Sequence, residues 1–275
     1  MKKNLALVLA AVMTMGCVLT GCGGDAKETK TETATEAAEA RTTFTVGFDA
    51  SFPPYGYQED GEYVGFDLDL AAEVCERNGW ELGKQPINWD SKDMELDAET
   101  IDCIWNGFTM TGRESEYTWS CAYIDNSQVF VVKADSGITS QADLKDKNVG
   151  VQADSSALAA LENTEEGGAA DLAATFASLT QYGDYNTGFM ELESGVIDAL
   201  AMDIGVAQYQ IEARGDEYVM LEEKLATEQY AVGFKLGNTE LKDKVEKTLL
   251  EMAEDGTVLE IAKEYGLEDQ LCIGK

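Results

Sequence analysis

The run from Asn106 to Arg113 gathers small hydroxyl side chains, glycines and one guanidinium. It follows the apolar segment 101–105, which is typical of a buried strand. A strand that ends in small residues exposes backbone N–H groups, and the planar fork of arginine holds a carboxylate through two parallel hydrogen bonds. The run therefore indicates a carboxylate-binding site. Packing of Thr109 and Thr111 at a strand end, with Arg113 in a surface turn, is the alternative.

A second strand end repeats this arrangement. Residues 196–198 lead through an apolar segment to Asp203, as residues 100–102 lead to Asn106. If the two segments belong to facing α/β lobes, Arg113 and Asp203 bracket a small zwitterion, the first on its carboxylate and the second on its ammonium. The alternative role for Asp203 is to cap a following helix.

The composition argues against several kinds of function. The 275 residues include no histidine and no Cys-x-x-Cys spacing, so we expect no metal site, no cofactor and no histidine-based catalysis. Asp and Glu outnumber Lys and Arg by 52 to 20, which gives a formal net charge of -32. This acidity argues against a nucleic-acid partner and favours a monomer whose surface repels its neighbours.

The N-terminal region has the features of an export signal over residues 1–21. Lys2 and Lys3 precede the apolar region 5–12, and Leu19-Thr20-Gly21-Cys22 resembles a bacterial lipoprotein box. That resemblance implies a lipid on Cys22. The alternative is an uncleaved membrane anchor, for which the uncharged run is barely long enough.

The segment 22–41 has no aromatic and no branched aliphatic residue, so it cannot form a core. We expect a flexible tether that keeps the folded part near the membrane, which suits a partner in that membrane. Beyond it lie Cys75, Cys103, Cys121 and Cys272, which allow three disulfide pairings, although Cys75 and Cys103 suit buried thiols equally well.

The remaining residues alternate between strand and helix patterns, which predicts parallel sheets flanked by helices. Asp67 is expected to cap a helix that Gly79 ends. The other expected elements are strands at 44–48, 129–132, 148–151 and 197–202, and helices at 185–192 and 240–255.

Several ordered motifs together resemble one family. They are Val46-Gly47-Phe48-Asp49 with Phe52-Pro53-Pro54-Tyr55, Val64 to Leu70, Ile101-Asp102 with Thr109-Met110-Thr111, Val149-Gly150-Val151, Ile197-Asp198-Ala199 and Asp255-Gly256-Thr257. From about 43 to 267 the chain resembles the bacterial family 3 solute-binding proteins, which deliver polar amino acids to ABC importers.

The resemblance implies an α/β fold of the two-lobed periplasmic-binding-protein type (type II). Each lobe is expected to be a mostly parallel sheet flanked by helices, with the ligand in the cleft between the lobes. The expected boundaries are 42–127 with 232–275 for lobe 1 and 128–231 for lobe 2. The implied partners are an amino acid, an ABC permease and its ATPase, and the membrane through Cys22.

The resemblance also implies ligand contacts from lobe 1. These are aromatic walls and small polar contacts at Phe52, Trp89, Asn106, Gly107 and Thr109. Arg113 would hold the α-carboxylate, although only Gly112 separates it from Thr111 where the family usually has two residues. Asp49 would contact the ligand side chain. The alternative is that Phe52 packs a turn and Trp89 packs the core.

From lobe 2, the resemblance implies that Ser155 and Ser156 also meet the carboxylate and that Asp203 takes the α-ammonium. Gln152 would contact the ligand side chain. Asp154 stands before these serines where the family commonly has glycine, so it brings an extra acid close to the site.

These features predict an amino-acid receptor that closes on its ligand. An acidic ligand would need a second cation, which no implied position supplies, so a neutral polar or cationic amino acid is favoured. One alternative is an enzyme on the same fold, such as a dehydratase, that uses Asp49, Asp154 or Asp203. Another is a surface protein for sensing or adhesion that is not tied to transport.

Overall fold

The computed structural model describes residues 41–274. The expected signal peptide 1–21, the lipidation site Cys22 and the tether up to residue 40 lie outside the described residues. Within residues 41–274 no helix is long and apolar enough to cross a membrane.

The first sheet has the strand order β5-β1-β6-β14-β7. β1 pairs in parallel with β5 and β6, whereas β14 pairs antiparallel with β6 and β7. The strands are β1 (Thr43–Phe48), β5 (Glu81–Pro86), β6 (Cys103–Ile104), β7 (Thr118–Trp119) and β14 (Gly233–Phe234). Phe44, Val46 and Phe48 are fully buried, so the alternation in β1 places one face of this strand in the core.

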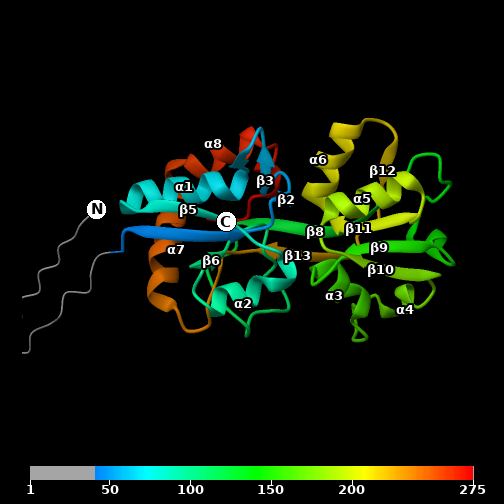
Figure 1. Ribbon diagram of the computed structural model, residues 1–275, viewed down its shortest axis with the longest axis horizontal. Coiled ribbons are helices and arrows are strands. Elements are labelled where there is room, and N and C mark those ends of the chain that lie inside the picture. The colour runs from blue at the N-terminus through cyan, green and yellow to red at the C-terminus, as the bar shows by residue number, and fades with distance from the viewer. Residues whose placement is uncertain (1–40, 275) are drawn as a thin grey trace, which may run out of the picture. The chain divides into compact units, whose positions relative to one another are not determined.

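Helices lie on both sides of this sheet. In Figure 1, α1 lies above β1 and α2 lies below it. α1 packs against α7 and α8, and α2 packs against β1 and β6. The bounds are α1 (Phe66–Asn78), α2 (Lys92–Asp97), α7 (Thr239–Asp255) and α8 (Thr257–Glu264). A small antiparallel sheet, β2 (Ser51–Phe52), β3 (Gly56–Glu59) and β4 (Glu62–Val64), joins β1 to α1.

The predicted end of α1 is confirmed, but its predicted cap is wrong. Gly79 follows the helix with a φ of 68°, the left-handed conformation that glycine adopts readily. Gly65, not Asp67, occupies the N-cap position. The Asp67 carboxylate instead accepts hydrogen bonds from the Gly107 backbone N–H and the Tyr123 hydroxyl, so it supports the loop after β6.

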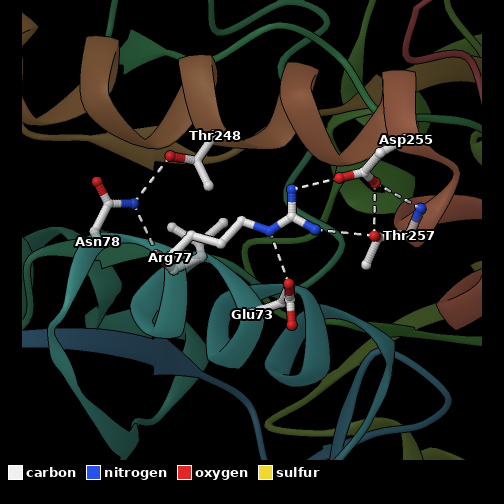
Figure 2. A network of polar contacts seen from close by, with 7 residues as sticks. Glu73, Arg77, Asn78, Thr248, Asp255 and Thr257 are labelled. Atoms are coloured by element: carbon white, nitrogen blue, oxygen red, sulfur yellow. Dashed lines mark hydrogen bonds and ion pairs between the residues drawn. The ribbon is translucent and has the colours of Figure 1, made fainter.

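A polar network ties α1 to the two C-terminal helices (Figure 2). The Arg77 guanidinium contacts Glu73 at 2.7 Å, Asp255 at 2.7 Å and the Thr257 hydroxyl at 2.9 Å. Nearby, the Asn78 side-chain amide donates to the Thr248 hydroxyl at 2.9 Å. These contacts lie within the layer beside the first sheet and fix its helices to one another.

The second sheet has the order β10-β9-β11-β8-β12, and β13 also pairs with β8. The strands are β8 (Ile124–Lys133), β9 (Asn148–Gln152), β10 (Ser178–Tyr182), β11 (Ala199–Asp203), β12 (Tyr218–Met220) and β13 (Ala226–Tyr230). In Figure 1, α5 and α6 lie on one side of this sheet, and α3 and α4 lie on the other. The helices are α3 (Ser156–Glu162), α4 (Ala170–Ala173), α5 (Tyr185–Ser194) and α6 (Ile204–Arg214).

The α/β class and the predicted strands and helices are confirmed, with the strand expected from residue 197 beginning at Ala199. Within that class, each sheet is mixed rather than mostly parallel. The reason is that the chain leaves the first sheet after β7, enters the second through β8, and returns from β13 to β14. β8 and β13 pair antiparallel because they carry the chain in opposite directions.

Of the two possibilities left open from the sequence, disulfides or thiols, three cysteines of the described region take the second. Cys75 and Cys103 are buried thiols at apolar positions, and Cys121 also carries a free thiol. Burial raises the pKa of the Cys75 thiol to about 11, so this group stays protonated at neutral pH.

Candidate functional site

A small cavity lies where residues of both sheets meet. It is lined by Phe52, Trp89, Gly107, Thr109, Arg113, Gln152, Ser155, Ser156 and Asp203. All of these were expected from the sequence to contact a ligand. The volume of the cavity is about 10 Å³, which is close to the room that one water molecule needs. A larger solute therefore enters only when the two sides of the cavity separate.

Two aromatic side chains form walls of this cavity. Phe52 stacks on Tyr185 with ring centroids 5.8 Å apart, and Trp89 meets the ring of Phe108 edge-on at 5.5 Å. Phe52 is 6% exposed and Trp89 is 8% exposed. Each ring thus combines the two roles considered from the sequence, because one side packs in the core and another side faces the cavity.

Hydroxyl groups from the two sheets meet directly at the cavity. Thr109, in the loop after β6, donates from Oγ1 to the Ser156 Oγ at 3.3 Å. Ser155 is the N-cap of α3, and its hydroxyl accepts from the Leu158 backbone N–H. The Ser156 hydroxyl does not cap its own helix and instead bonds to side chains, since it also accepts from the Gln128 amide and donates to Glu228.

Arg113 also reaches from the first side of the cavity to the second. Its Nη2 donates to the backbone oxygen of Asp154 at 3.3 Å, and its guanidinium carbon lies 5.5 Å from the centre of the Phe108 ring. The shortened spacing after Thr111 does not move Arg113 away from the site. This cation is held loosely enough to exchange a neutral backbone oxygen for a carboxylate.

Asp203 occupies the N-cap position of α6, as the alternative interpretation required, but its side chain makes no capping hydrogen bond. Instead Oδ1 accepts from the side chains of Asn126 at 2.9 Å, Gln128 at 2.6 Å and Tyr230, while Oδ2 accepts from the Tyr185 hydroxyl at 2.9 Å. Burial raises the pKa of the Asp203 carboxyl. The carboxylate is thus oriented by side chains inside the site and does not bond to the backbone at the start of α6.

Asp49 and Asn106 are the two predicted residues that do not line the small cavity. Asp49 Oδ2 accepts from the Gln152 side-chain amide at 2.9 Å, and Asn106 Oδ1 accepts from the Asp49 backbone N–H at 3.0 Å. Both are therefore connected to the cavity through Gln152. Burial raises the pKa of Asp49 to about 6.

Asp49 also lines a larger cleft next to the small cavity. This cleft has a volume of about 550 Å³ and shares Trp89 with the small cavity. Its acidic lining residues are Asp49, Asp90, Glu95 and Asp184. Within the described part of the chain, no lysine or arginine lines it. The cleft therefore favours a cationic group.

Gly107 allows the chain to pass close to Phe52. Its φ is 56°, and a Cβ atom there would lie 2.8 Å from the Phe52 ring and 3.0 Å from the Tyr230 ring. Its N–H donates to Asp67 Oδ2 at 2.5 Å. Any side chain at this position would both strain the backbone and displace the aromatic wall.

Two charged residues of this region were missed by the sequence reasoning. Lys92 is 2% exposed, and its Nζ contacts the carboxylate of Asp154, which follows β9 of the second sheet. Glu228 is 7% exposed and accepts from the Ser156 hydroxyl at 3.2 Å. The burial of Glu228 could have been predicted from the sequence, because Glu228 alternates with Tyr230 along the buried face of β13. No such pattern indicated the burial of Lys92, since it stands in an ordinary polar segment.

Comparison with known proteins places this geometry in a family. A family model described as bacterial extracellular solute-binding proteins, family 3, matches residues 44–268. The chain belongs to this family. The resemblance recognised from the motifs is thereby confirmed.

Individual relatives of this family 3 protein match over nearly their whole length. The chain is 27% identical to the L-cystine-binding protein TcyJ of Escherichia coli, over 93% of this chain and 94% of that protein. It is 28% identical to the arginine-binding extracellular protein ArtP of Bacillus subtilis, over 96% of this chain and 98% of the relative.

A solved structure gives the same result. An ABC uptake transporter substrate-binding protein from Streptococcus pneumoniae, crystallised with bound histidine, superimposes with a TM-score of 0.77 at 38% identity. The match covers 81% of this chain and 92% of that one. These relatives are binding proteins and not enzymes, which agrees with the predicted non-enzymatic role and argues against the dehydratase alternative.

Proposed function

We propose that this family 3 protein binds an amino acid between its two sheets and delivers it to the permease of an ABC importer, which its ATPase drives. The observation that carries the proposal is the pairing of opposite charges around one cavity. Arg113 lines this cavity together with Asp203 and with the hydroxyl-bearing residues Thr109, Ser155 and Ser156. An α-amino acid carries the complementary pair, a carboxylate and an ammonium.

The carboxylate subsite consists of Arg113, Thr109 and Ser156. The guanidinium supplies charge and two parallel N–H groups, and the hydroxyls supply further donors. The ammonium subsite is Asp203, whose carboxylate is held in place by Tyr185 and Tyr230. The buried rings of Phe52 and Trp89 exclude water, which strengthens both charge pairs.

A cationic side chain fits the larger cleft best. The cleft is lined by four carboxyl groups, Asp49, Asp90, Glu95 and Asp184, and shares Trp89 with the small cavity. A guanidinium, ammonium or imidazolium placed there is attracted to these groups, whereas the side chain of glutamate or aspartate is repelled. Among the relatives, ArtP is named as arginine-binding and the Streptococcus protein holds histidine, which supports this ligand class.

Binding requires a hinge motion because the small cavity has a volume of only about 10 Å³. The moving parts are lobe 1, residues 42–127 with 232–275, and lobe 2, residues 128–231. The paired strands β8 and β13 lie where the chain passes between the sheets and serve as the hinge. An amino acid that contacts both lobes stabilises only the closed form, so it shifts the population toward closure.

The protein works outside the cytoplasm, in keeping with the extracellular character of its family. A lipid on Cys22 anchors it to the outer face of the membrane, and the segment 22–41 tethers the folded part near the permease. It acts as a monomer, with a surface whose negative charge opposes self-association.

Thermal-shift scans of the mature protein test the proposal. Bound ligand is first removed by unfolding and refolding, and the panel contains the proteinogenic amino acids, ornithine and cystine. An amino acid present at a thousand times its dissociation constant adds about 4 kcal/mol to the free energy of unfolding. We expect arginine, lysine, ornithine or histidine to raise the midpoint most. A flat panel contradicts amino-acid binding, and a preference for glutamate contradicts the role of the acidic cleft.

Agmatine, which lacks the carboxylate of arginine, is the matched control. It retains the cationic side chain and the amine, so any stabilisation that arginine gives beyond it measures the carboxylate subsite.

A further inference from the structure

Three neighbouring strands place a group of polar side chains on one face at the base of the site. Asp203 on β11 lies opposite Gln128 on β8, and Asn126 on β8 lies opposite Glu228 on β13. Residues two apart on a strand share a face, and so do residues directly opposite on paired strands. Gln128 and Asn126 are therefore adjacent on the face where Asp203 and Glu228 meet.

Two side-chain amides are shared by the two carboxyl groups. The Asn126 Nδ2 donates to Asp203 Oδ1 at 2.9 Å and to Glu228 Oε1 at 2.6 Å. The Gln128 Nε2 donates to the same two oxygens at 2.6 Å and 2.7 Å. Both acids thus crowd around a common pair of donors, which brings their negative charges close together.

The groups that form hydrogen bonds with this pair are polar but uncharged. Within residues 41–274, the hydrogen-bond partners of Asp203 and Glu228 are the amides of Asn126 and Gln128, the Ser156 hydroxyl, and the phenols of Tyr185 and Tyr230. The Tyr55 phenol also lies close enough to both acids for their negative charges to contribute to its raised pKa. None of these groups is a cation. Arg113 lines the same cavity as Asp203, but its printed hydrogen bond goes to the backbone oxygen of Asp154 and not to either acid.

Two buried carboxyl groups that share a site do not both ionise easily. Burial and the neighbouring Asp203 raise the pKa of Glu228 to about 7, and burial raises the pKa of Asp203 as well. Asp49 also lies close enough to Tyr185 for its charge to contribute to the raised pKa of that phenol, after burial and Asp203. At neutral pH the pair therefore retains a proton for part of the time, and its titration belongs to both groups together.

We infer that Glu228 is the second carboxylate of the ammonium subsite, and that an incoming amino acid displaces the proton that Glu228 and Asp203 share. The inference rests on the proposed function, because it assigns the ammonium of the bound amino acid to Asp203. The ligand keeps all three protons of its ammonium. The displaced proton leaves a carboxyl oxygen and passes to the solvent buffer, so that both acids become carboxylates around one cation.

This exchange makes affinity depend on pH with a definite sign. Above pH 7 the pair is increasingly ionised, so the ammonium binds without having to expel a proton. As the pH falls below about 7, each binding event must release up to one proton, and the affinity falls by up to tenfold per pH unit. A subsite with one ordinary carboxylate would show no such slope between pH 6 and pH 8.

Isothermal titration calorimetry of the mature protein in several buffers measures the proton directly. L-Arginine, L-lysine and L-glutamine, whose own groups do not titrate near neutral pH, serve as probes in phosphate, PIPES and Bis-Tris at pH 6.5. We expect the observed enthalpy to vary linearly with the ionisation enthalpy of the buffer, with a slope that reports proton release. Binding with the same enthalpy in all buffers overturns the inference and leaves the proposed function intact. No binding by any probe overturns both.

Glu228→Gln is the matched variant, because glutamine keeps the shape and one acceptor oxygen but cannot ionise. We expect it to bind without releasing a proton and to lose the slope of affinity between pH 6 and pH 8. Glu222→Gln changes an exposed glutamate six residues earlier and should behave like the wild type. Unchanged proton release in Glu228→Gln overturns the assignment. If the variant folds poorly, the buffer series on the wild type still shows whether binding releases a proton.

Discussion

Lys92, on α2 beside the first sheet, forms an ion pair with Asp154, in the loop that leads from the second sheet into α3. Lys92 is 2% exposed and lies over the ring of Trp89 at 5.3 Å, whereas the Asp154 side chain is 49% exposed. The pair therefore joins the two sides of the proposed ligand site. It can form only when those sides are together.

Asp154→Asn should speed the release of a bound amino acid. The substitution removes the charge that pairs with Lys92, so the closed arrangement loses a contact while the open arrangement loses nothing. We expect the dissociation rate to rise by about three- to tenfold, measured by stopped-flow fluorescence, with little change in the melting temperature without ligand. Asp171→Asn, on the exposed side of α4, is the control. Equal dissociation rates in the two variants would show that the ion pair between Lys92 and Asp154 does not hold the closed form together.

Arg113→Ala should weaken the binding of amino acids strongly. The variant leaves the bound carboxylate without its charged partner in a site that excludes water, which costs about 2 to 5 kcal/mol. We expect a rise of roughly 30- to 5000-fold in the dissociation constant, measured by calorimetry. Agmatine, which has no carboxylate, should lose far less affinity. An unchanged affinity for the amino acid would show that another group holds the carboxylate.

Asp203→Asn should discriminate between amino acids and their deaminated analogues. Asparagine keeps the size of the side chain and one of the two acceptor oxygens that Tyr230 and Tyr185 use, but removes the negative charge that attracts an ammonium. We expect the amino acid to lose at least about tenfold more affinity than the analogue without the ammonium, measured by competition binding. Parallel losses for both ligands are the outcome that contradicts an ammonium subsite at Asp203.

Much of the site could be predicted from the sequence because short motifs place its residues at strand ends. Asn106 to Arg113 follows β6, and Asp203 ends β11, so the carboxyl ends of two strands supply the opposite charges. The motif order then identified the family. What local sequence could not supply is the pairing between distant segments.

Glu228 illustrates this limit. Its alternation with Tyr230 fixes the face on which it lies, but only the register of β13 against β8 places it beside Asn126 and hence beside Asp203. Lys92 depends even more on tertiary structure, because burial of a lysine in a polar segment requires a partner from the other sheet. Asp67 failed as a cap for the same reason, since Gly107 and Tyr123 compete for its carboxylate.

The network around Arg77 should make stability depend on pH in the acid range (Figure 2). Hydrogen bonds from Thr257 and Arg77 lower the pKa of the Asp255 carboxyl to about 2, below its ordinary value in an unfolded chain. A depressed pKa contributes stability that is fully present above the unfolded value of about 4 and is lost as the pH falls toward about 2. Asp255→Asn should therefore lower the melting temperature at pH 6, and the difference from the wild type should shrink between pH 4 and pH 2.

Glu254→Gln, one residue earlier and exposed, is the control. A difference that stays constant down to pH 2 would mean that Asp255 acts through its shape rather than its charge.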